Sequence, residues 1–175
     1  MEPAIAFPDF TGKADLWAFF VAQSHAYLRE GGRLAFVLSW SLLCSNYGDA
    51  VLSFLSRYFM VDAIIDSRVE RFFAAKQHVV LLFARRARDP GRQSSATSNP
   101  HIDSAHPVRF VRLKRPLMSM LRTELRRGKQ GEDLMDELMA ITTDVDDDPR
   151  WDVHVVAQGD LWRRETSHDD SEDDA

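Results

Sequence analysis

The stretch Glu70–His78, ERFFAAKQH, holds two adjacent phenylalanines in a short polar segment. Apolar stretches of strand length flank it, Val61–Ile65 before it and Val79–Phe83 after it. Side chains of a strand point alternately to opposite faces of a sheet, so neighbouring aromatic rings cannot both pack into one face. Phe72 and Phe73 therefore need an explanation other than ordinary strand packing.

A second group of residues could contact phosphate. Between Arg109 and Lys129 the chain holds eight bases and a single acid, Glu124. The bases are Arg109, Arg112, Lys114, Arg115, Arg122, Arg126, Arg127 and Lys129. Clustered bases supply the sequence-independent part of nucleic-acid affinity, so a phosphate-contacting surface is one interpretation. The alternative is the solvated face of a helix.

The other reactive residue types lack the spacing that their chemistry requires. Gly31-Gly32 precedes an apolar stretch, whereas the glycines of nucleotide-binding loops follow a strand and precede a helix. We interpret this pair as a helix stop. The six histidines show no metal-site spacing, so we predict no metal. Cys44 is expected to be a packed side chain, and we assign no catalytic residue.

Acidic charge is concentrated in the last residues. Glu165–Ala175 holds six of the 27 acids and no Lys or Arg, and is expected to be a disordered tail. The rest of the chain, with 21 acids and 22 bases, is nearly neutral. A single cysteine excludes a disulfide framework and favours a cytoplasmic location. The first residues do not have the pattern of a signal peptide, and the longest apolar run is too short to span a membrane.

The first half of the chain alternates between helical and strand patterns. Apolar residues at helical spacing predict helices over Lys13–Arg29 and Tyr47–Phe59. The nearly continuous apolar run Arg33–Trp40 is typical of a strand covered on both faces. Two more strands are predicted over Val61–Asp66 and His78–Arg86, and their short connection makes them an antiparallel pair. The alternation predicts half of a doubly wound α/β sheet.

A segment rich in Ser, Pro and Gly divides the chain. Beyond it we predict strands at VRFVRLK and WDVHVVAQGDLW, a helix that begins near Pro116, and another helix at EDLMDELMA. The extension is expected to be mainly helical. The expected divisions are 1–87 for an α/β part, 88–107 for a linker, 108–164 for the extension and 165–175 for the tail.

Together these pieces resemble a known family. GKADLWAFF, GGRLAFVLSW, SNYGDAVLSF, VDAIIDSRVERFF and HVVLLFARR are similar to the later half of the catalytic domain of adenine-specific DNA methyltransferases. The similarity is to enzymes of type II restriction–modification and phage defence in which the cofactor motif precedes the catalytic motif. It covers residues 12–87 and continues weakly through VRFVRLKRPL and WDVHVVAQGDLW, toward a target-recognition region.

The resemblance implies a fold and a chemistry. The fold would be part of a Rossmann-like class I methyltransferase sheet, an α/β fold whose last strand is antiparallel. The reaction would transfer a methyl group from S-adenosylmethionine to the exocyclic amine of an adenine rotated out of double-stranded DNA, without a metal. Phe72 falls where the family places a ring against the flipped base, with Phe73 as the other register. Asp15 and Phe20 match positions of the cofactor pocket. The expected phosphate contacts are Lys76, Arg109, Arg112, Lys114 and Arg115.

Two essential parts of the family pattern are missing. Neither a G-x-G cofactor loop nor an Asn/Asp-Pro-Pro-aromatic tetrapeptide precedes Gly12, and Asn99-Pro100 lies in the linker and is interpreted as chance. Catalysis needs the amine held in line with the methyl group, and the missing tetrapeptide supplies its acceptors. We therefore expect a fragment that is inactive alone, with the other half upstream or on a partner chain.

Two alternatives stay open. The chain could be a noncatalytic DNA-binding or assembly subunit that pairs with a partner through its open sheet edge. It could also be a methyltransferase fragment that acts on RNA or protein, because a fold does not fix a substrate.

Overall fold

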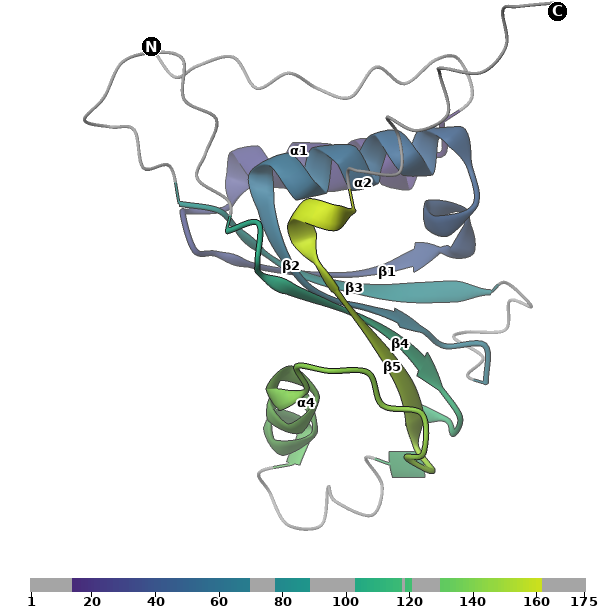
Figure 1. The fold of residues 1–175 in the computed structure, drawn as a ribbon. Coiled ribbons are helices and arrows are strands. Elements are labelled where there is room, and N and C mark those ends of the chain that lie inside the picture. Colours follow the sequence, from purple (N-terminus) through teal and green to yellow (C-terminus); the bar gives the residue numbers. More distant parts are fainter. Residues whose placement is uncertain (1–13, 70–77, 89–102, 118, 121–129, 162–175) are drawn as a thin grey trace, which may run out of the picture.

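A computed structural model of the chain describes residues 14–69, 78–88, 103–117, 119–120 and 130–161. These residues form one five-stranded sheet with helices on both faces (Figure 1). The strands are β1 Arg33–Ser39, β2 Phe59–Asp66, β3 Val79–Arg86, β4 Pro107–Leu113 and β5 Trp151–Ala157. The helices are α1 Leu16–Tyr27, α2 Asn46–Tyr58 and α4 Gln130–Ala140, with short 3₁₀ turns η1 Trp40–Leu43 and η3 Gln158–Asp160.

The strand order is β1-β3-β2-β4-β5. The predicted antiparallel pairing of β2 with β3 is confirmed, and β3 also pairs antiparallel with β1. Since β3 lies between them, β1 and β2 run parallel to each other. β4 pairs parallel with β2 on the side away from β3. β5 pairs antiparallel with β4 and is the other edge strand of the sheet. The sheet is therefore mixed.

The extension differs from the mainly helical expectation. Its two predicted strands, β4 and β5, are present, and both belong to the same sheet as β1, β2 and β3. The predicted helix α4 is confirmed, and residues 117, 119 and 120 near Pro116 are helical. The described parts on the two sides of the expected linker thus share one sheet, because the free edge of β2 accepts β4.

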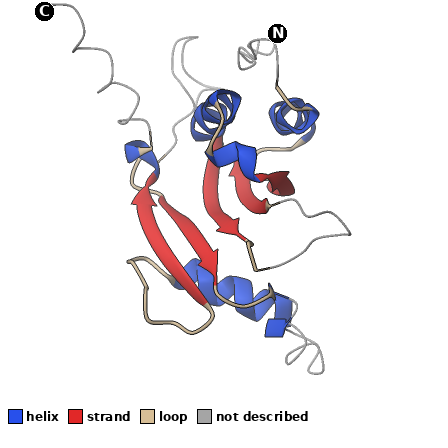
Figure 2. Cartoon of the chain, turned by 90° about the vertical axis from the view of Figure 1, so that its right-hand side faces the viewer, coloured by secondary structure: helices blue, strands red, loops and turns tan. Residues whose placement is uncertain are grey.

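Two apolar cores lie on the two faces of the sheet. α1 and α2 lie side by side over one face, and α4 lies against the other (Figures 1 and 2). Alternation along β2 sends Ile64 to the first core and Ile65 to the second. A strand covered on both faces needs apolar residues at successive positions, which explains why the sequence of β2 shows no polar alternation.

The apolar stripe that predicts α1 is not its buried face. α1 buries Ala18, Val21, Ala22 and His25 against the sheet and α2. The stripe residues point outward, with exposed fractions of 68% for Leu16, 45% for Phe19, 55% for Phe20 and 80% for Tyr27. The small residues let α1 pack against α2 and the first core, and the four large apolar residues are largely exposed.

A buried amide ties the end of the described chain to the middle of the sheet. Gln158, 1% exposed, accepts a hydrogen bond from the Val61 amide at 2.9 Å. Its side-chain nitrogen donates to the carbonyls of Ser56 and Phe59, at 3.2 and 2.7 Å. Val61 adjoins an irregularity in the register of β2 and β3, so Gln158 satisfies main-chain groups where the ladder is disturbed.

Replacing Gln158 with Ala should lower the free energy of unfolding by about 2–4 kcal/mol, because buried main-chain groups lose their hydrogen bonds. Urea denaturation monitored by circular dichroism would measure the change. Gln23→Ala is the matched control, since Gln23 is exposed and makes one long contact of 3.5 Å to the Tyr27 hydroxyl. Equal stability of both variants would contradict the role of Gln158.

Candidate functional site

Three strands end at the same edge of the sheet. β1, β2 and β4 run parallel, so their carboxyl ends at Ser39, Asp66 and Leu113 lie together. Asp66 stands directly beside Arg112 in the register of β2 and β4. Ligands of open α/β sheets bind outside the carboxyl ends of the strands. This edge is therefore the candidate site, and the segment that joins β2 to β3 leaves from it.

The predicted base-stacking residues Phe72 and Phe73 lie outside the described residues, as does Lys76. The residues that attach this segment to the sheet are described. The amide and hydroxyl of Ser67 both donate to the Val79 carbonyl, at 3.5 and 2.9 Å. The two ends of the segment are thereby held against each other at the edge of the sheet.

A compact polar cluster lies at this attachment. The His78 ring lies 2.6 Å from Asp66 Oδ1 and stacks on Trp40, with centroids 4.1 Å apart and an angle of 10° between the planes. The Trp40 amide donates to the His78 carbonyl at 3.0 Å. Arg68 donates to Asp66 Oδ2 at 2.7 Å and places its guanidinium 5.0 Å from the Trp40 centroid. Sequence reasoning missed this cluster because its members come from three different elements.

The charge of Asp66 is stabilised in the folded state. Burial by itself would raise the pKa of this carboxyl group, since burial disfavours the charged form. The hydrogen bonds from His78 and Arg68 outweigh that effect, and the pKa of Asp66 lies below its ordinary value of 3.8. A lowered pKa means that the ionised carboxylate stabilises the fold above the ordinary pKa. That contribution is lost as the pH falls through the lowered value.

We expect Asp66→Asn to be less stable than the parent chain at neutral pH, because the contacts of the carboxylate with Arg68 and His78 are weakened. The difference should shrink as the pH falls below 3.8, where the parent carboxylate becomes protonated too. Urea denaturation from neutral to acidic pH would measure both proteins, with the exposed Asp136→Asn as the charge-matched control. A deficit that stays constant through the acid range would mean that the charge of Asp66 does not matter.

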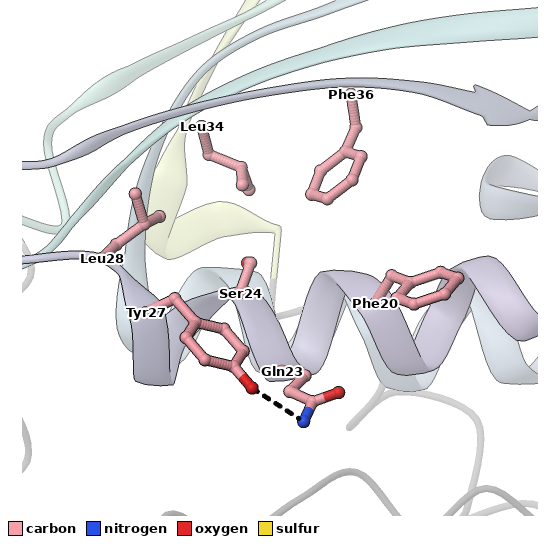
Figure 3. Close-up of a pocket in the computed structure, with 7 residues that line it drawn as sticks. All are labelled: Phe20, Gln23, Ser24, Tyr27, Leu28, Leu34 and Phe36. Carbon is pink, nitrogen blue, oxygen red and sulfur yellow. Dashed lines mark hydrogen bonds between the residues drawn. The ribbon is translucent and has the colours of Figure 1, made fainter.

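The two predicted cofactor residues have different surroundings. Asp15 precedes α1, and its Oδ2 accepts a hydrogen bond from the Tyr47 hydroxyl at 2.9 Å. Phe20 lines an open apolar groove between α1 and β1 together with Leu34 and Phe36 (Figure 3). The remaining lining residues are Gln23, Ser24, Tyr27 and Leu28. Phe20 thus lies beside the edge strand β1, whereas Asp15 is hydrogen-bonded to α2.

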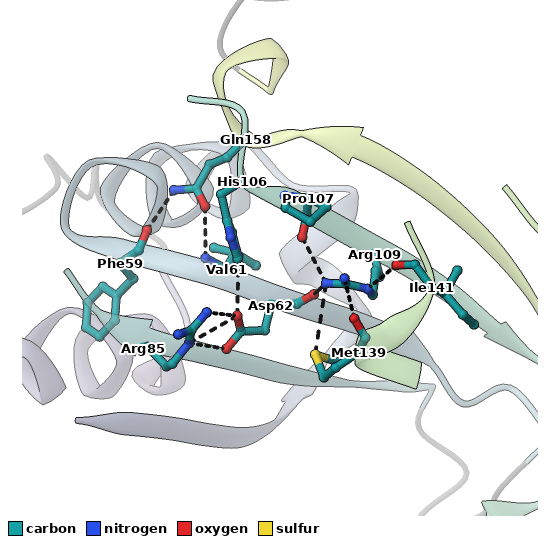
Figure 4. Close-up of polar contacts among 10 residues, drawn as sticks. All are labelled: Phe59, Val61, Asp62, Arg85, His106, Pro107, Arg109, Met139, Ile141 and Gln158. Carbon is teal, nitrogen blue, oxygen red and sulfur yellow. Dashed lines mark hydrogen bonds and ion pairs between the residues drawn. The ribbon is translucent and has the colours of Figure 1, made fainter. Parts of the chain in front are cut away.

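Of the predicted phosphate contacts, Arg109 has a different role. Its side chain points into the space between β4 and α4, and the residue is 4% exposed. The guanidinium donates to the carbonyls of Met139 at 2.6 Å, Ile141 at 2.7 Å and Pro107 at 3.1 Å (Figure 4). Burial, the largest cause, lowers the pKa of Arg109 from its ordinary value. Arg109 is therefore not placed to contact phosphate, because its N–H donors already bind main-chain carbonyls.

Arg109→Met should lower the free energy of unfolding by about 2–4 kcal/mol, since buried carbonyls lose their donor. Arg115→Met, at an exposed position, should change it by less than about 0.5 kcal/mol. Urea denaturation would compare the two variants. An Arg109→Met protein of unchanged stability would contradict a structural role for this arginine.

The other described bases of this set lie at the carboxyl edge of β4. Arg112 and Lys114 are exposed and both bind Asp152 on β5. Arg115 follows them and is also exposed. The structure therefore brings these three bases together, near the attachment of the segment that carries the predicted aromatic pair.

Among the residues that the structure describes, no group of three or more His, Cys, Asp or Glu side chains could hold a metal ion. In the same part of the chain, every helix is too short or too polar to cross a membrane.

The fold is an open α/β sheet with a candidate site at its carboxyl edge, and it has a distant structural relative. No protein-family model matches the chain, and no curated protein matches it. Among solved structures, the fold is similar to part of the type IIG restriction endonuclease BpuSI, with a TM-score of 0.56 and 14% sequence identity. The match covers 91% of this chain and 16% of that protein, so the chain spans about a sixth of the length of BpuSI.

Proposed function

We propose that this chain forms the later part of the catalytic domain of an adenine-specific DNA methyltransferase from a restriction–modification or related defence system. The methyl donor is S-adenosylmethionine, and the substrate is an adenine rotated out of double-stranded DNA. The cofactor loop and the Asn-Pro-Pro-aromatic motif are supplied by a separate half of the sheet that docks on β1. Both substrates are available in the cytoplasm.

The observation that carries the proposal is the open edge of β1. Among the described strands β1 pairs only with β3, so its other side presents main-chain N–H and C=O groups. Unpaired edges of this kind are templates for a further strand. Nothing on β1 blunts the edge in the usual ways, because RLAFVLS has no proline and one charge. A preceding strand of the same sheet fits this edge.

Apolar surface flanks the open edge on both faces of the sheet. On the side of α1, Phe20 and Tyr27 are exposed beside the groove that Phe36 lines. On the other face Val37 of β1 is 50% exposed, because α4 packs further along the sheet. Large contiguous apolar patches are uncommon on finished surfaces of soluble domains. Helices of a completed sheet would cover both patches.

The strand order also supports the proposal. The family expectation is an antiparallel last strand, and β3 is antiparallel to both of its neighbours. The distant likeness to a type IIG restriction endonuclease points to proteins of restriction–modification systems. It does so through the fold alone, so the chemistry rests on the sequence resemblance.

In the proposed reaction Phe72 stacks on the flipped adenine, and Phe73 packs beneath it. Lys76, Arg112, Lys114 and Arg115 contact phosphates of the DNA. Asp15 and Phe20 contribute to the wall of the cofactor pocket. The chain alone is expected to bind S-adenosylmethionine poorly, because the loop that holds the cofactor is not in this sequence.

The proposal is tested by reconstitution. The 175-residue chain would be produced with the product of an adjacent upstream reading frame that carries a G-x-G loop and an Asn-Pro-Pro-aromatic motif. N6-methyladenine in co-purified plasmid DNA would be measured by mass spectrometry. We expect methylation with both parts and none with either part alone. Absence of methylation with a stable complex would refute the proposal.

Within such a complex, Phe72→Ala should reduce the methylation rate about 5- to 150-fold, since stacking on a base contributes roughly 1–3 kcal/mol. Phe73→Ala is the matched control and should reduce it less. A larger effect of Phe73→Ala would mean that Phe73, and not Phe72, stacks on the base. Calorimetry with S-adenosylmethionine supplies a further check, because micromolar affinity for the chain alone would contradict the expected dependence on a second half.

The alternative of a noncatalytic assembly or DNA-binding subunit is favoured by the same open edge. In that case the chain would co-purify with a partner that lacks cofactor and catalytic motifs. Substituting proline within β1, at a residue whose N–H faces the open edge, would abolish that complex, because proline cannot donate to a strand ladder. Methylation of DNA by the reconstituted pair would support the methyltransferase, and a stable complex without methylation would support the noncatalytic subunit.

A further inference from the structure

On β4 and β5, a single carboxylate is bound by two cations. Asp152 of β5 lies directly opposite Arg112 of β4 in the antiparallel register. Arg112 Nη2 lies 2.5 Å from Asp152 Oδ2, and Lys114 Nζ lies 2.5 Å from Asp152 Oδ1. Each oxygen of this carboxylate thus has its own cation.

This arrangement has the form of a site for one phosphate of a nucleic-acid backbone. A phosphodiester presents two charged oxygens on one atom, as a carboxylate does, and arginine binds both groups through the same fork of N–H donors. Arg112 already uses two nitrogens on Asp152, since its Nε donates to Oδ2 at 3.1 Å. Asp152 therefore occupies the place that a phosphate oxygen pair would take.

The cations are more accessible than the carboxylate. The side chain of Arg112 is 66% exposed and that of Lys114 is 35% exposed, whereas that of Asp152 is 16% exposed. Exposed ion pairs are weak because water and salt screen them. A polyanion can therefore draw Arg112 away from Asp152 without separating the antiparallel pair of β4 and β5.

The acidic loop before β5 reaches Lys114 through main-chain carbonyls. These are the carbonyls of Asp146 and Asp148, at 2.8 and 3.1 Å. The carboxylate of Asp148 is taken up by Arg150, and that of Asp144 by His154. Asp152 is thus the carboxylate in the described part of the chain that binds both Arg112 and Lys114.

We propose that Asp152 is an intramolecular competitor for the DNA backbone, which lowers the affinity of the β4 edge for DNA until a phosphate displaces it from Arg112 and Lys114. The inference rests on the proposed function, because it takes DNA as the partner of this edge. It adds a residue that limits nonspecific binding, since each phosphate contact here must first break an internal ion pair.

The test measures binding of the full chain to a short fluorescein-labelled DNA duplex by fluorescence anisotropy at low salt. Asp152→Asn should bind about three- to tenfold more tightly than the parent chain, because the phosphate no longer competes with a carboxylate. Asp152→Glu keeps the charge and should bind like the parent. Asp136→Asn, an exposed position on α4, removes the same charge elsewhere and should change the affinity less than about twofold.

Combined substitutions distinguish direct competition from a general change of charge. If Asp152 acts through Arg112 and Lys114, Asp152→Asn should give no gain in a background that carries both Arg112→Gln and Lys114→Gln. A gain that persists there, or an equal gain in Asp136→Asn, would overturn the inference. Thermal melting of each variant confirms that it is folded. The anisotropy measurement needs no cofactor and no methyl transfer. A negative result here would therefore not affect the reconstitution test. A negative reconstitution test would likewise not change what the anisotropy measurement says about Asp152.

Discussion

The hydrogen bonding of β3 to strands on both of its sides is the constraint on which the rest of the structure depends. β3 is the link between β1 with its helix α1 and the group of β2, β4 and β5. Only residues 67–78 join β2 to β3, so the chain turns back and lays β3 antiparallel beside β2. Val80 and Leu82 then face the core under α1 and α2, and Leu81 faces the core under α4. Both cores therefore include this one strand.

Local pattern predicted the elements, and long-range pairing decided their arrangement. The strands and helices follow from apolar spacing, and the short connection correctly gave the antiparallel pair. The joining of β4 to β2 depends on a free edge about fifty residues earlier in the chain, which no local pattern records. α1 has two apolar faces, one of small residues that include Ala18 and Ala22 and one of large residues. The spacing of apolar residues does not show which face is buried, and the structure buries the face of small residues.

For the candidate site, too, the sequence predicted single residues, and the structure was needed to show which of them meet. The clustered bases correctly marked β4 as a basic strand, but the clustering did not distinguish the buried Arg109 from the exposed Arg112. Arg109 and Arg112 are three residues apart, so strand alternation sends them to opposite faces, and this rule applied to the sequence would have separated them. The pairing of Arg112 with Asp152, and of Asp66 with His78, arises from elements that meet only in the folded sheet. The aromatic pair Phe72 and Phe73 was singled out from its place between two predicted strands, and it stays a prediction because both residues lie outside the described part of the chain.

Gln158 gives the fold a dependence on the order of synthesis. Its hydrogen-bond partners on α2 and β2 leave the ribosome about a hundred residues before it does. Until then, the polar groups near the irregular part of β2 must be solvated by water, and the first core cannot close over them. Any division of the protein that keeps β2 must therefore keep residue 158, because a chain that ends earlier leaves the amide of Val61 without this partner.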